Sequence, residues 1–376
     1  MSNQIAPAAN PKMPVVAAAN NQLPKIAISC GDLNGIGLEV ILKTLADKRI
    51  TQQCTPVLFA SKKAVDFYVA TLPEDLRKEV QFEVAKTLEN LPAGKVYLFP
   101  AWQEEVTIQP GQLTEAAGKY AVRSLQVAAQ ALKDGLVDGL VTAPLHKGNT
   151  RSEDFPYTGH TPFLKNFFSA KEGVMMLHDD TLRVALATEH IPLSAVPAAL
   201  TQYGMAHKLG VVAEALTRDF GIDKPRIAVL GLNPHAGDGG EIGKEEETII
   251  SPAIEDAKRA GILAFGPYPA DAFFARASYR HFDAVFALYH DQGLIPLKTI
   301  AGGRGVNYTA GLPVIRTSPD HGTAFDIAGQ GVADPESFRE ALFNCIDRIW
   351  QRQRYTENGA NPLPRTKSQR ERGFGG

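Results

Sequence analysis

The sequence predicts an α/β protein with a mostly parallel sheet, on three observations. The chain has 376 residues, a length that favours two domains. Hydrophobic residues make up 44% and charged residues 21%, which is the balance of a globular protein with a large core. Short apolar runs alternate with stretches whose apolar residues recur at helical spacing. Parallel strands joined by crossover helices produce this alternation.

The expected elements alternate along most of the chain. Apolar runs typical of strands occupy residues 25–29 (KIAIS), 56–60 (PVLFA), 95–99 (KVYLF), 139–144 (GLVTAP), 174–177 (VMML), 182–188 (LRVALAT), 226–233 (RIAVLGLN) and 283–289 (DAVFALY). Helical patterns occupy residues 38–47, 61–70, 114–135, 195–218 and 245–260. Parallel sheets bind ligands at the carboxyl ends of their strands, so the functional site is expected in the segments that follow these runs.

Charge and cysteine content narrow the class of protein. The chain has 39 Lys and Arg against 41 Asp and Glu, so neither nucleic acid nor an anionic membrane is an expected partner. No apolar run reaches the roughly 18 residues of a membrane-spanning helix. Cys30, Cys54 and Cys345 are far apart and form no CxxC pair. This spacing favours a reducing, cytoplasmic location over a disulfide scaffold.

Both ends of the chain differ in composition from its middle. Residues 1–23 are rich in Ala, Asn and Pro and carry one charge, Lys12, so we expect a disordered leader. Residues 351–376 hold six basic and two acidic residues among Pro and Gly, and we expect a disordered basic tail.

Three of the strand-like runs end in a histidine, namely His190, His235 and His290. Imidazole is the commonest metal ligand, and three histidines with an open position are typical of a catalytic zinc or similar divalent site. Ligands from separate strands would leave no local motif in the sequence. The pattern therefore indicates either a divalent metal site or three unrelated loop histidines.

A second set of residues suits an anion. His160 and Thr161 stand at a predicted helix start, where backbone N–H groups and the helix dipole favour negative charge. Further polar side chains lie in or beside glycine-rich segments, at Lys298, Arg304, Asn307, Arg316 and His321. Such a set suits phosphate or carboxylate, with surface charge as the alternative, and we expect Arg304 and His321 to be structural. The motifs GxGxxG, GxxxxGK[ST] and GxSxG are absent.

Several long segments together carry a family resemblance. They are GDLNGIGLE (31–39), VTAPLHKG (141–148), YTGHTPF (157–163), VALATEHIPL (184–193), GLNPHAGDGG (231–240), GPYPADAFF (266–274), YHDQGLIPLK (289–298) and GRGVNYTAGLPVIRTSPDHGTAFDIAG (303–329). In this order they resemble the 4-hydroxythreonine-4-phosphate dehydrogenase family of pyridoxal phosphate biosynthesis. The resemblance covers roughly residues 24–350.

The resemblance implies a metal-dependent dehydrogenase that uses NAD or NADP without the GxGxxG motif. It implies that His190, His235 and His290 bind a divalent metal, with zinc preferred and magnesium, cobalt or manganese as alternatives. The implied substrate contacts are His160, Thr161, Lys298, Asn307 and Arg316. Asp271 is a candidate for orienting the substrate amine or moving a proton, with a turn or capping aspartate as the alternative. The resemblance also implies a homodimer. In such a dimer the metal site lies at the subunit interface, and one of its histidines comes from the partner subunit.

The implied fold is similar to isocitrate and isopropylmalate dehydrogenases, with two α/β domains and a cleft between them. The first domain is expected over residues 24–150 plus 305–350 and the second over residues 151–304. The family's usual first-loop string is Gly-Glu-Pro-Ala-Gly-Ile-Gly-Pro-Glu, and Leu33 and Leu38 replace its two prolines. Because the glycines remain, we expect the turn to persist with a looser backbone.

The implied reaction acts on a phosphorylated small molecule. It oxidises 4-phosphooxy-L-threonine (4-hydroxythreonine 4-phosphate) and decarboxylates the product to 3-amino-2-oxopropyl phosphate. The nearest alternative is a dehydrogenase of a four-carbon sugar-acid phosphate, D-threonate or D-erythronate 4-phosphate. A phosphate acyltransferase would share the architecture without needing the three histidines. A non-enzymatic binding protein would need neither the histidines nor the anion set.

Overall fold

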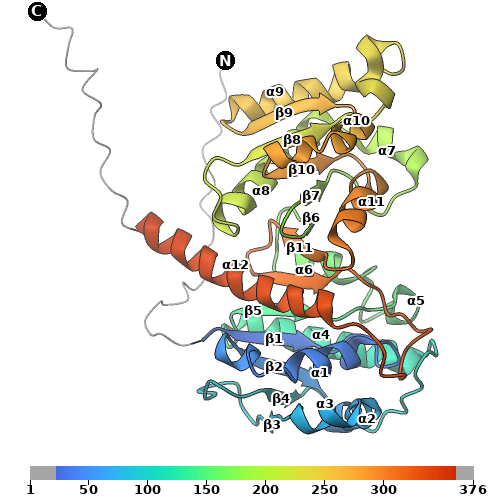
Figure 1. Cartoon of the computed structure of the whole chain (residues 1–376), viewed down its shortest axis with the longest axis vertical. Coiled ribbons are helices and arrows are strands. Elements are labelled where there is room, and N and C mark those ends of the chain that lie inside the picture. Colours follow the sequence, from blue (N-terminus) through green and yellow to red (C-terminus); the bar gives the residue numbers. More distant parts are fainter. Residues whose placement is uncertain (1–22, 361–376) are drawn as a thin grey trace, which may run out of the picture. The chain divides into compact units, whose positions relative to one another are not determined.

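A computed structural model describes residues 23–360, which form two compact units (Figure 1). Unit 1 comprises residues 23–170, 303–307 and 312–346, and unit 2 comprises residues 171–302, 308–311 and 347–360. Strand pairs within the units are parallel with one exception, which confirms the predicted α/β class. Residues 1–22 of the expected leader and 361–376 of the expected tail lie outside the described residues.

The sheet of unit 1 has the strand order β3-β4-β2-β1-β5-β12, with every neighbouring pair parallel. Its strands are β1 (Lys25–Ser29), β2 (Thr55–Ala60), β3 (Glu83–Val84), β4 (Tyr97–Pro100), β5 (Gly139–Thr142) and β12 (Arg316–Pro319). Its helices are α1 (Gly37–Leu45), η1 (Ile50–Gln52), α2 (Lys62–Thr71), α3 (Glu74–Glu79), α4 (Glu115–Lys133), α5 (Lys147–Thr150) and α6 (His160–Phe167).

Unit 2 has the strand order β6-β7-β10-β8-β9, and only β6 and β7 run antiparallel. Its strands are β6 (Val174–His178), β7 (Arg183–Leu186), β8 (Arg226–Leu230), β9 (Leu263–Tyr268) and β10 (Ala284–Ala287). Its helical segments are η2 (Leu193–Ala195), α7 (Val196–Ala199), α8 (Gln202–Arg218), η3 (Pro234–Gly240), η4 (Glu246–Ile250), α9 (Ser251–Arg259), α10 (Ala270–Ala275), η5 (Ser278–His281) and α11 (His290–Ala301).

Two elements contribute residues to both units. β11 (Val306–Ala310) passes from unit 1 to unit 2 after residue 307, and α12 (Glu336–Ala360) does so after residue 346. The units differ from the domains expected from the sequence, because residues 151–170 belong to unit 1. There Lys133 of α4 lies 4.6 Å from the ring centre of Phe167 in α6. Residues 351–360 continue α12 as a regular helix, whereas the sequence placed them in a disordered tail.

Side-chain caps explain where the longer helices begin. Ser61, Thr114 and Thr201 precede α2, α4 and α8, and each side chain accepts a hydrogen bond from a backbone N–H of the first turn. Such caps satisfy N–H groups that the helix itself leaves unpaired. Ser124 then joins α4 to the sheet of unit 1, since its hydroxyl accepts from Cys30 N at 2.9 Å and donates to Phe59 O at 2.6 Å. The helix is thereby fixed on strands β1 and β2, whose ends lead into the site.

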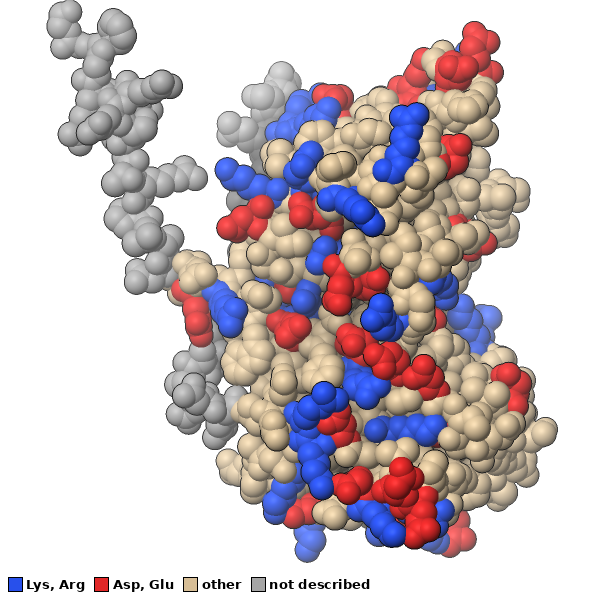
Figure 2. Space-filling model, in the orientation of Figure 1, with Lys and Arg blue, Asp and Glu red and all other residues tan. Residues whose placement is uncertain are grey.

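The surface is mixed in charge. Lys and Arg alternate with Asp and Glu over the face drawn in Figure 2, in keeping with the net charge of −2. Among residues 23–360, no helix is long and apolar enough to cross a membrane.

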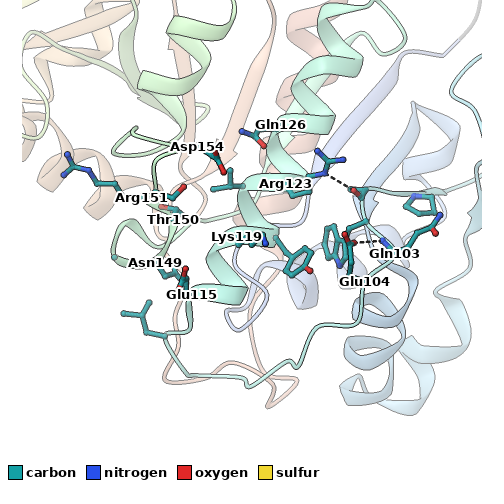
Figure 3. A pocket seen from close by; sticks show the side chains of 18 residues that line it. Gln103, Glu104, Glu115, Lys119, Arg123, Gln126, Asn149, Thr150, Arg151 and Asp154 are labelled. Atoms are coloured by element: carbon teal, nitrogen blue, oxygen red, sulfur yellow. Dashed lines mark hydrogen bonds between the residues drawn. The ribbon is translucent and has the colours of Figure 1, made fainter.

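Unit 1 contains an open cavity of about 1170 Å³ beside α4 (Figure 3). Helix α4 contributes Lys119, Arg123 and Gln126 to its lining, and the segment after α5 contributes Arg151 and Asp154. Acidic and basic side chains face the same space, so the cavity carries no strong preference for one sign of charge. None of the residues that the sequence predicts to bind metal or substrate lines it.

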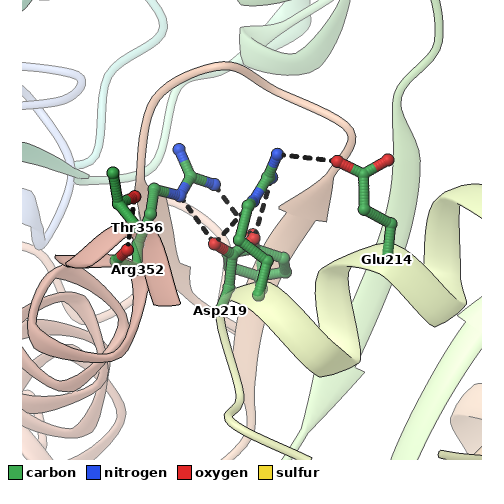
Figure 4. A network of polar contacts seen from close by, with 6 residues as sticks. Glu214, Asp219, Arg352 and Thr356 are labelled. Atoms are coloured by element: carbon green, nitrogen blue, oxygen red, sulfur yellow. Dashed lines mark hydrogen bonds and ion pairs between the residues drawn. The ribbon is translucent and has the colours of Figure 1, made fainter. Parts of the chain in front are cut away.

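A buried carboxylate organises the polar interior of unit 2 (Figure 4). Asp219 is fully buried and accepts hydrogen bonds from Arg218 at 3.0 Å, from Arg352 of α12 at 2.6 Å and from the Tyr308 hydroxyl at 2.5 Å. Burial by itself would raise the pKa of Asp219, but the charges and hydrogen bonds of Arg352 and Arg218 outweigh it and lower the pKa to about 2. The network ties α8, β11 and α12 together.

We expect Asp219→Asn to lower the free energy of unfolding by about 3 kcal/mol, because removing one partner of a buried ion pair leaves the other uncompensated. Since the folded pKa of about 2 lies below the ordinary aspartate value of 3.8, the stabilisation is complete above that value and disappears as the pH falls towards 2. Urea unfolding at neutral pH and across the acid range measures both effects.

Glu214→Gln is the matched control, because Glu214 contacts the same Arg218 at 3.0 Å but is 64% exposed. An exposed pair of this kind contributes less than about 1 kcal/mol. Equal losses in the two variants would show that burial of Asp219 has no special role.

Candidate active site

The three strand-end histidines all belong to unit 2. His190 follows β7, His235 lies in η3 after β8, and His290 is the first residue of α11 after β10. Strands β7, β10 and β8 are neighbours and run parallel, so their carboxyl ends meet at one edge of the sheet. The structure therefore brings all three histidine-bearing segments to that edge, where α/β sheets bind their ligands.

His190 and His290 lie next to each other at this edge. Their ring centroids are 5.5 Å apart and the rings are inclined at 44°. Nδ1 of His290 lies 2.7 Å from a carboxylate oxygen of Asp291. A carboxylate on one ring nitrogen fixes the tautomer and directs the other nitrogen outward, which is the usual support for a metal-binding histidine. Within residues 23–360 of one chain, no group of three or more His, Cys, Asp or Glu side chains lies close enough to hold a metal ion.

His235 is presented by a loop of unusual backbone conformation. Residues 235–239 all have positive φ, with His235 at 54°. Glu246, which is 3% exposed, holds the entrance of this loop by accepting hydrogen bonds from Leu232 N at 2.8 Å and Asn233 N at 2.7 Å. Residues other than glycine rarely adopt positive φ without such support, so the carboxylate sets the position of His235.

The segment that carries His190 is also tied to its neighbours. The Thr188 hydroxyl donates to Leu288 O at 2.7 Å, and Nζ of Lys208 donates to Ala187 O at 2.6 Å. Leu288 lies two residues before His290, so the Thr188 bond connects the approaches to His190 and His290. Beyond the last backbone pairs of the sheet, these side-chain hydrogen bonds hold the segments after β7 and β10 in place.

Unit 1 holds a buried arginine that has no acidic partner within residues 23–360. Arg316, the first residue of β12, is 2% exposed. Its Nε and Nη2 donate to the Thr142 hydroxyl at 3.1 and 2.6 Å, while Nη1 is buried without a partner among the described residues. Burial lowers the pKa of Arg316 to about 9, so the guanidinium remains charged at neutral pH. A buried cation that faces only a hydroxyl is suited to an incoming anion.

His160 stands beside this arginine as a neutral imidazole. Burial lowers its pKa well below the ordinary value, and the positive charge of Arg316 lowers it further. One ring nitrogen bonds to the backbone of Ala143, and Nε2 is buried without a partner among the described residues. A neutral ring whose other nitrogen is held by the backbone can exchange a hydrogen bond with a ligand through Nε2.

Asn307 of β11 adds a third polar atom to unit 1, since its Oδ1 is also buried without a partner among the described residues. Thr161 lies next to His160 in the first turn of α6. The structure thus places His160, Thr161, Asn307 and Arg316 in one unit. The other two predicted residues belong to unit 2, where Asp271 lies in the first turn of α10 and the exposed Lys298 lies on α11.

The first loop keeps its turn without the two prolines. Gly31 has φ +72°, and a Cβ there would come within 2.6 Å of Pro144 O. The Asp32 side chain accepts from Asn34 N at 2.9 Å and from the Asn149 amide at 2.7 Å, and Ile36 N donates to Thr323 O at 3.0 Å. These bonds take over the restraint that proline rings would give.

Sequence reasoning missed the side chains that hold the candidate residues in place. Thr142 lies within the expected strand 139–144 and is the last residue of β5, so the sequence did place it near a strand end. Glu246 begins a helical segment 11 residues after His235, and nothing in its local sequence connects it to that histidine. His321, expected to be structural, donates a hydrogen bond from Nδ1 to Gly322 O at 3.0 Å.

The comparisons with known proteins agree with one another. Residues 52–345 match the family model described as pyridoxal phosphate biosynthetic protein PdxA. A 4-hydroxythreonine-4-phosphate dehydrogenase of Bacteroides thetaiotaomicron is 42% identical over 90% of this chain and 92% of its own length. The crystal structure of a Klebsiella pneumoniae protein of the same name superimposes with a TM-score of 0.76 at 33% identity, covering 88% of this chain and 99% of that one. A terephthalate 1,2-cis-dihydrodiol dehydrogenase of Burkholderia xenovorans gives a TM-score of 0.56 at 26% identity, covering 84% and 96%.

We expect Arg316→Lys to weaken the binding of inorganic phosphate about tenfold or more. An ammonium group is a point charge and cannot both hold the Thr142 hydroxyl and present a second donor edge to an anion. Isothermal titration of the purified protein with phosphate measures the change.

Arg304→Lys is the matched control, because Arg304 lies in the same unit and its side chain is exposed. This variant should bind phosphate as the wild type does. If both variants bind phosphate unchanged, Arg316 is not part of an anion site.

Proposed function

The chain belongs to the PdxA family of pyridoxal phosphate biosynthetic proteins, and on this premise we propose that it oxidises 4-hydroxythreonine 4-phosphate with NAD or NADP. The observation that carries the proposal is the buried guanidinium of Arg316, which lacks an acidic partner and lies beside the neutral His160. A phosphorylated substrate supplies the anion that this pair of side chains needs. The remaining contacts proposed for the substrate are Thr161, Asn307 and Lys298.

The proposed reaction is an oxidation followed by decarboxylation. The substrate carbinol loses a hydride to the nicotinamide and a proton from its hydroxyl, which gives a ketone β to the carboxylate. Loss of CO₂ from this keto acid leaves 3-amino-2-oxopropyl phosphate. The chain's own contribution is to anchor the anionic end at Arg316 and His160 and so hold the carbinol in a reactive pose. Asp271 is the proposed residue for orienting the amine or moving a proton.

We propose that a divalent ion, zinc before magnesium, cobalt or manganese, is held by His190, His235 and His290. The adjacent rings of His190 and His290 and the carboxylate of Asp291 on His290 Nδ1 fit such an ion. When bound, the ion supplies Lewis acidity that favours loss of the hydroxyl proton. Asp291 holds His290 through Nδ1, which leaves the other ring nitrogen for the ion, and Glu246 fixes the loop that presents His235.

A homodimer with a shared site accounts for the apolar side chains around these histidines. Ile191 follows His190 directly and is 40% exposed, and Leu193 is 67% exposed. Ile295, on the same helix as His290, is 64% exposed, and Tyr203 at the start of α8 is 81% exposed. Exposed apolar side chains mark an interaction surface where they form one contiguous patch, and we propose that these four do so. A partner that covers them reaches the metal ligands and can supply one histidine.

A reducing, cytoplasmic location is proposed from the cysteines. Cys30, Cys54 and Cys345 are all buried as free thiols. Burial raises the pKa of each thiol, to about 12 for Cys30 and Cys54. Thiols of this kind are inert packing groups and contribute no disulfide.

The decisive assay follows formation of the reduced nicotinamide with 4-hydroxythreonine 4-phosphate, in parallel with D-erythronate and D-threonate 4-phosphates. Turnover of the amino acid phosphate alone, abolished by EDTA, is the expected result. Turnover of a sugar-acid phosphate alone would keep the hydride chemistry and reject the proposed substrate.

We expect His235→Ala to lose bound metal and to lower kcat by about a hundredfold or more, since it removes one of three ligands. His281→Ala, an exposed histidine in the same unit, should keep both. Metal content by elemental analysis and the same assay give the two readouts. Stoichiometric metal and normal turnover in the His235 variant would reject the metal assignment.

We expect Leu193→Asp to convert the dimer to a monomer in sedimentation velocity, because a charge in an apolar interface is costly to desolvate. Val332→Asp tests the same change at a side chain of unit 1 that is 63% exposed, and this variant should remain dimeric. A dimeric Leu193 variant would place the interface elsewhere.

A further inference from the structure

Backbone pairing between strands β8 and β10 ends several residues before His235 and His290. Their last backbone pair joins Val229 to Phe286. Beyond it, β8 continues towards His235 and β10 towards His290. Backbone N–H and C=O groups in these buried segments still require hydrogen-bond partners.

The side-chain amide of Gln292 bridges the two segments at this point. Its Oε1 accepts from Leu288 N at 2.7 Å, and its Nε2 donates to Gly231 O at 2.6 Å. Gln292 lies in the first turn of α11, two residues after His290. The amide accepts one hydrogen bond and donates another, so it fixes the distance between the segments that follow β8 and β10.

Both ends of this bridge are themselves restrained. Gly231 packs so closely on the histidine loop that a Cβ there would lie 2.9 Å from Ala236, and its N–H donates to Tyr268 O at 2.8 Å. On the other side, Leu288 donates its N–H to Gln292 while its carbonyl accepts from the Thr188 hydroxyl at 2.7 Å. The peptide groups of Leu288 thus link the approaches to all three histidines.

We propose that Gln292 is a positioning residue that sets the separation of the segments carrying His235 and His290 and thereby tunes metal affinity. The inference rests on the proposed metal site. A glutamine is needed because a shorter amide cannot reach both backbone groups, and a side chain without an amide offers neither the donor nor the acceptor. Partners that orient metal ligands contribute strongly to affinity even though they do not touch the ion.

The test is Gln292→Met, which keeps the length of the side chain and removes both hydrogen bonds. We expect zinc to bind about 10 to 100 times more weakly, measured by competition with a chromophoric chelator. Hydrogen exchange at the Leu288 amide should be faster, and the Tm of the metal-free protein should fall, because two backbone groups lose their hydrogen-bond partners. Gln130→Met, the same change at an exposed glutamine of α4, is the matched control and should bind zinc normally.

Each outcome decides between the proposals. Unchanged zinc affinity in a Gln292→Met protein, with or without faster exchange at Leu288, overturns the positioning role and leaves the metal site standing. A wild-type protein that binds no zinc, cobalt, manganese or magnesium removes the metal site and the inference with it. If Gln292→Met fails to fold, Gln292→Asn takes its place, since the shorter amide keeps one hydrogen bond and should still weaken zinc binding.

Discussion

Where parallel strands stop pairing, their backbone polar groups still need hydrogen-bond partners, and this requirement shapes the candidate site. In unit 2 the partners are side chains: Thr188 and Gln292 on Leu288, and Glu246 on the loop after β8. A protein that left these groups unpaired would lose roughly 1–3 kcal/mol for each. The same bonds that satisfy the backbone also fix the histidine-bearing segments. Folding and site geometry therefore depend on one set of contacts.

Arginine appears in two contrasting electrostatic settings. Arg218 and Arg352 surround the buried carboxylate of Asp219, so their charges are compensated within the protein. Arg316 is also buried, but among residues 23–360 its side-chain hydrogen bonds go only to the hydroxyl of Thr142. A compensated arginine contributes to stability, whereas an uncompensated one retains attraction for an anion from outside. The contrast distinguishes the structural network around Asp219 from the candidate anion site at Arg316.

The sequence predicts the sheet well where strands are continuous apolar runs, as at 25–29 and 226–233. It leaves out β3, β9, β11 and β12, because β3 has only two residues and the other three contain Gly, Pro, Asn or Arg and so form no continuous apolar run. The candidate histidines are visible because they follow such runs directly. Glu246 and Gln292 are not visible, since their roles depend on backbone groups of neighbouring strands. The first segment of unit 1 ends at residue 170, whereas the sequence predicts a domain boundary after residue 150. Residues 151–170 belong to unit 1 because Phe167 of α6 contacts Lys133 of α4.

The division of the chain between the units bears on how the protein is made. The chain passes from one unit to the other after residues 170, 302, 307, 311 and 346, so neither unit is a continuous stretch of sequence. Arg316 meets Thr142 across 174 residues, and β5 gains its neighbour β12 only when that much more chain has been synthesised. Until then β5 presents an unpaired strand edge on the ribosome. A nascent chain of this design is exposed to aggregation at this edge from the synthesis of β5 to that of β12, so chaperone protection over that interval should increase the yield of native protein.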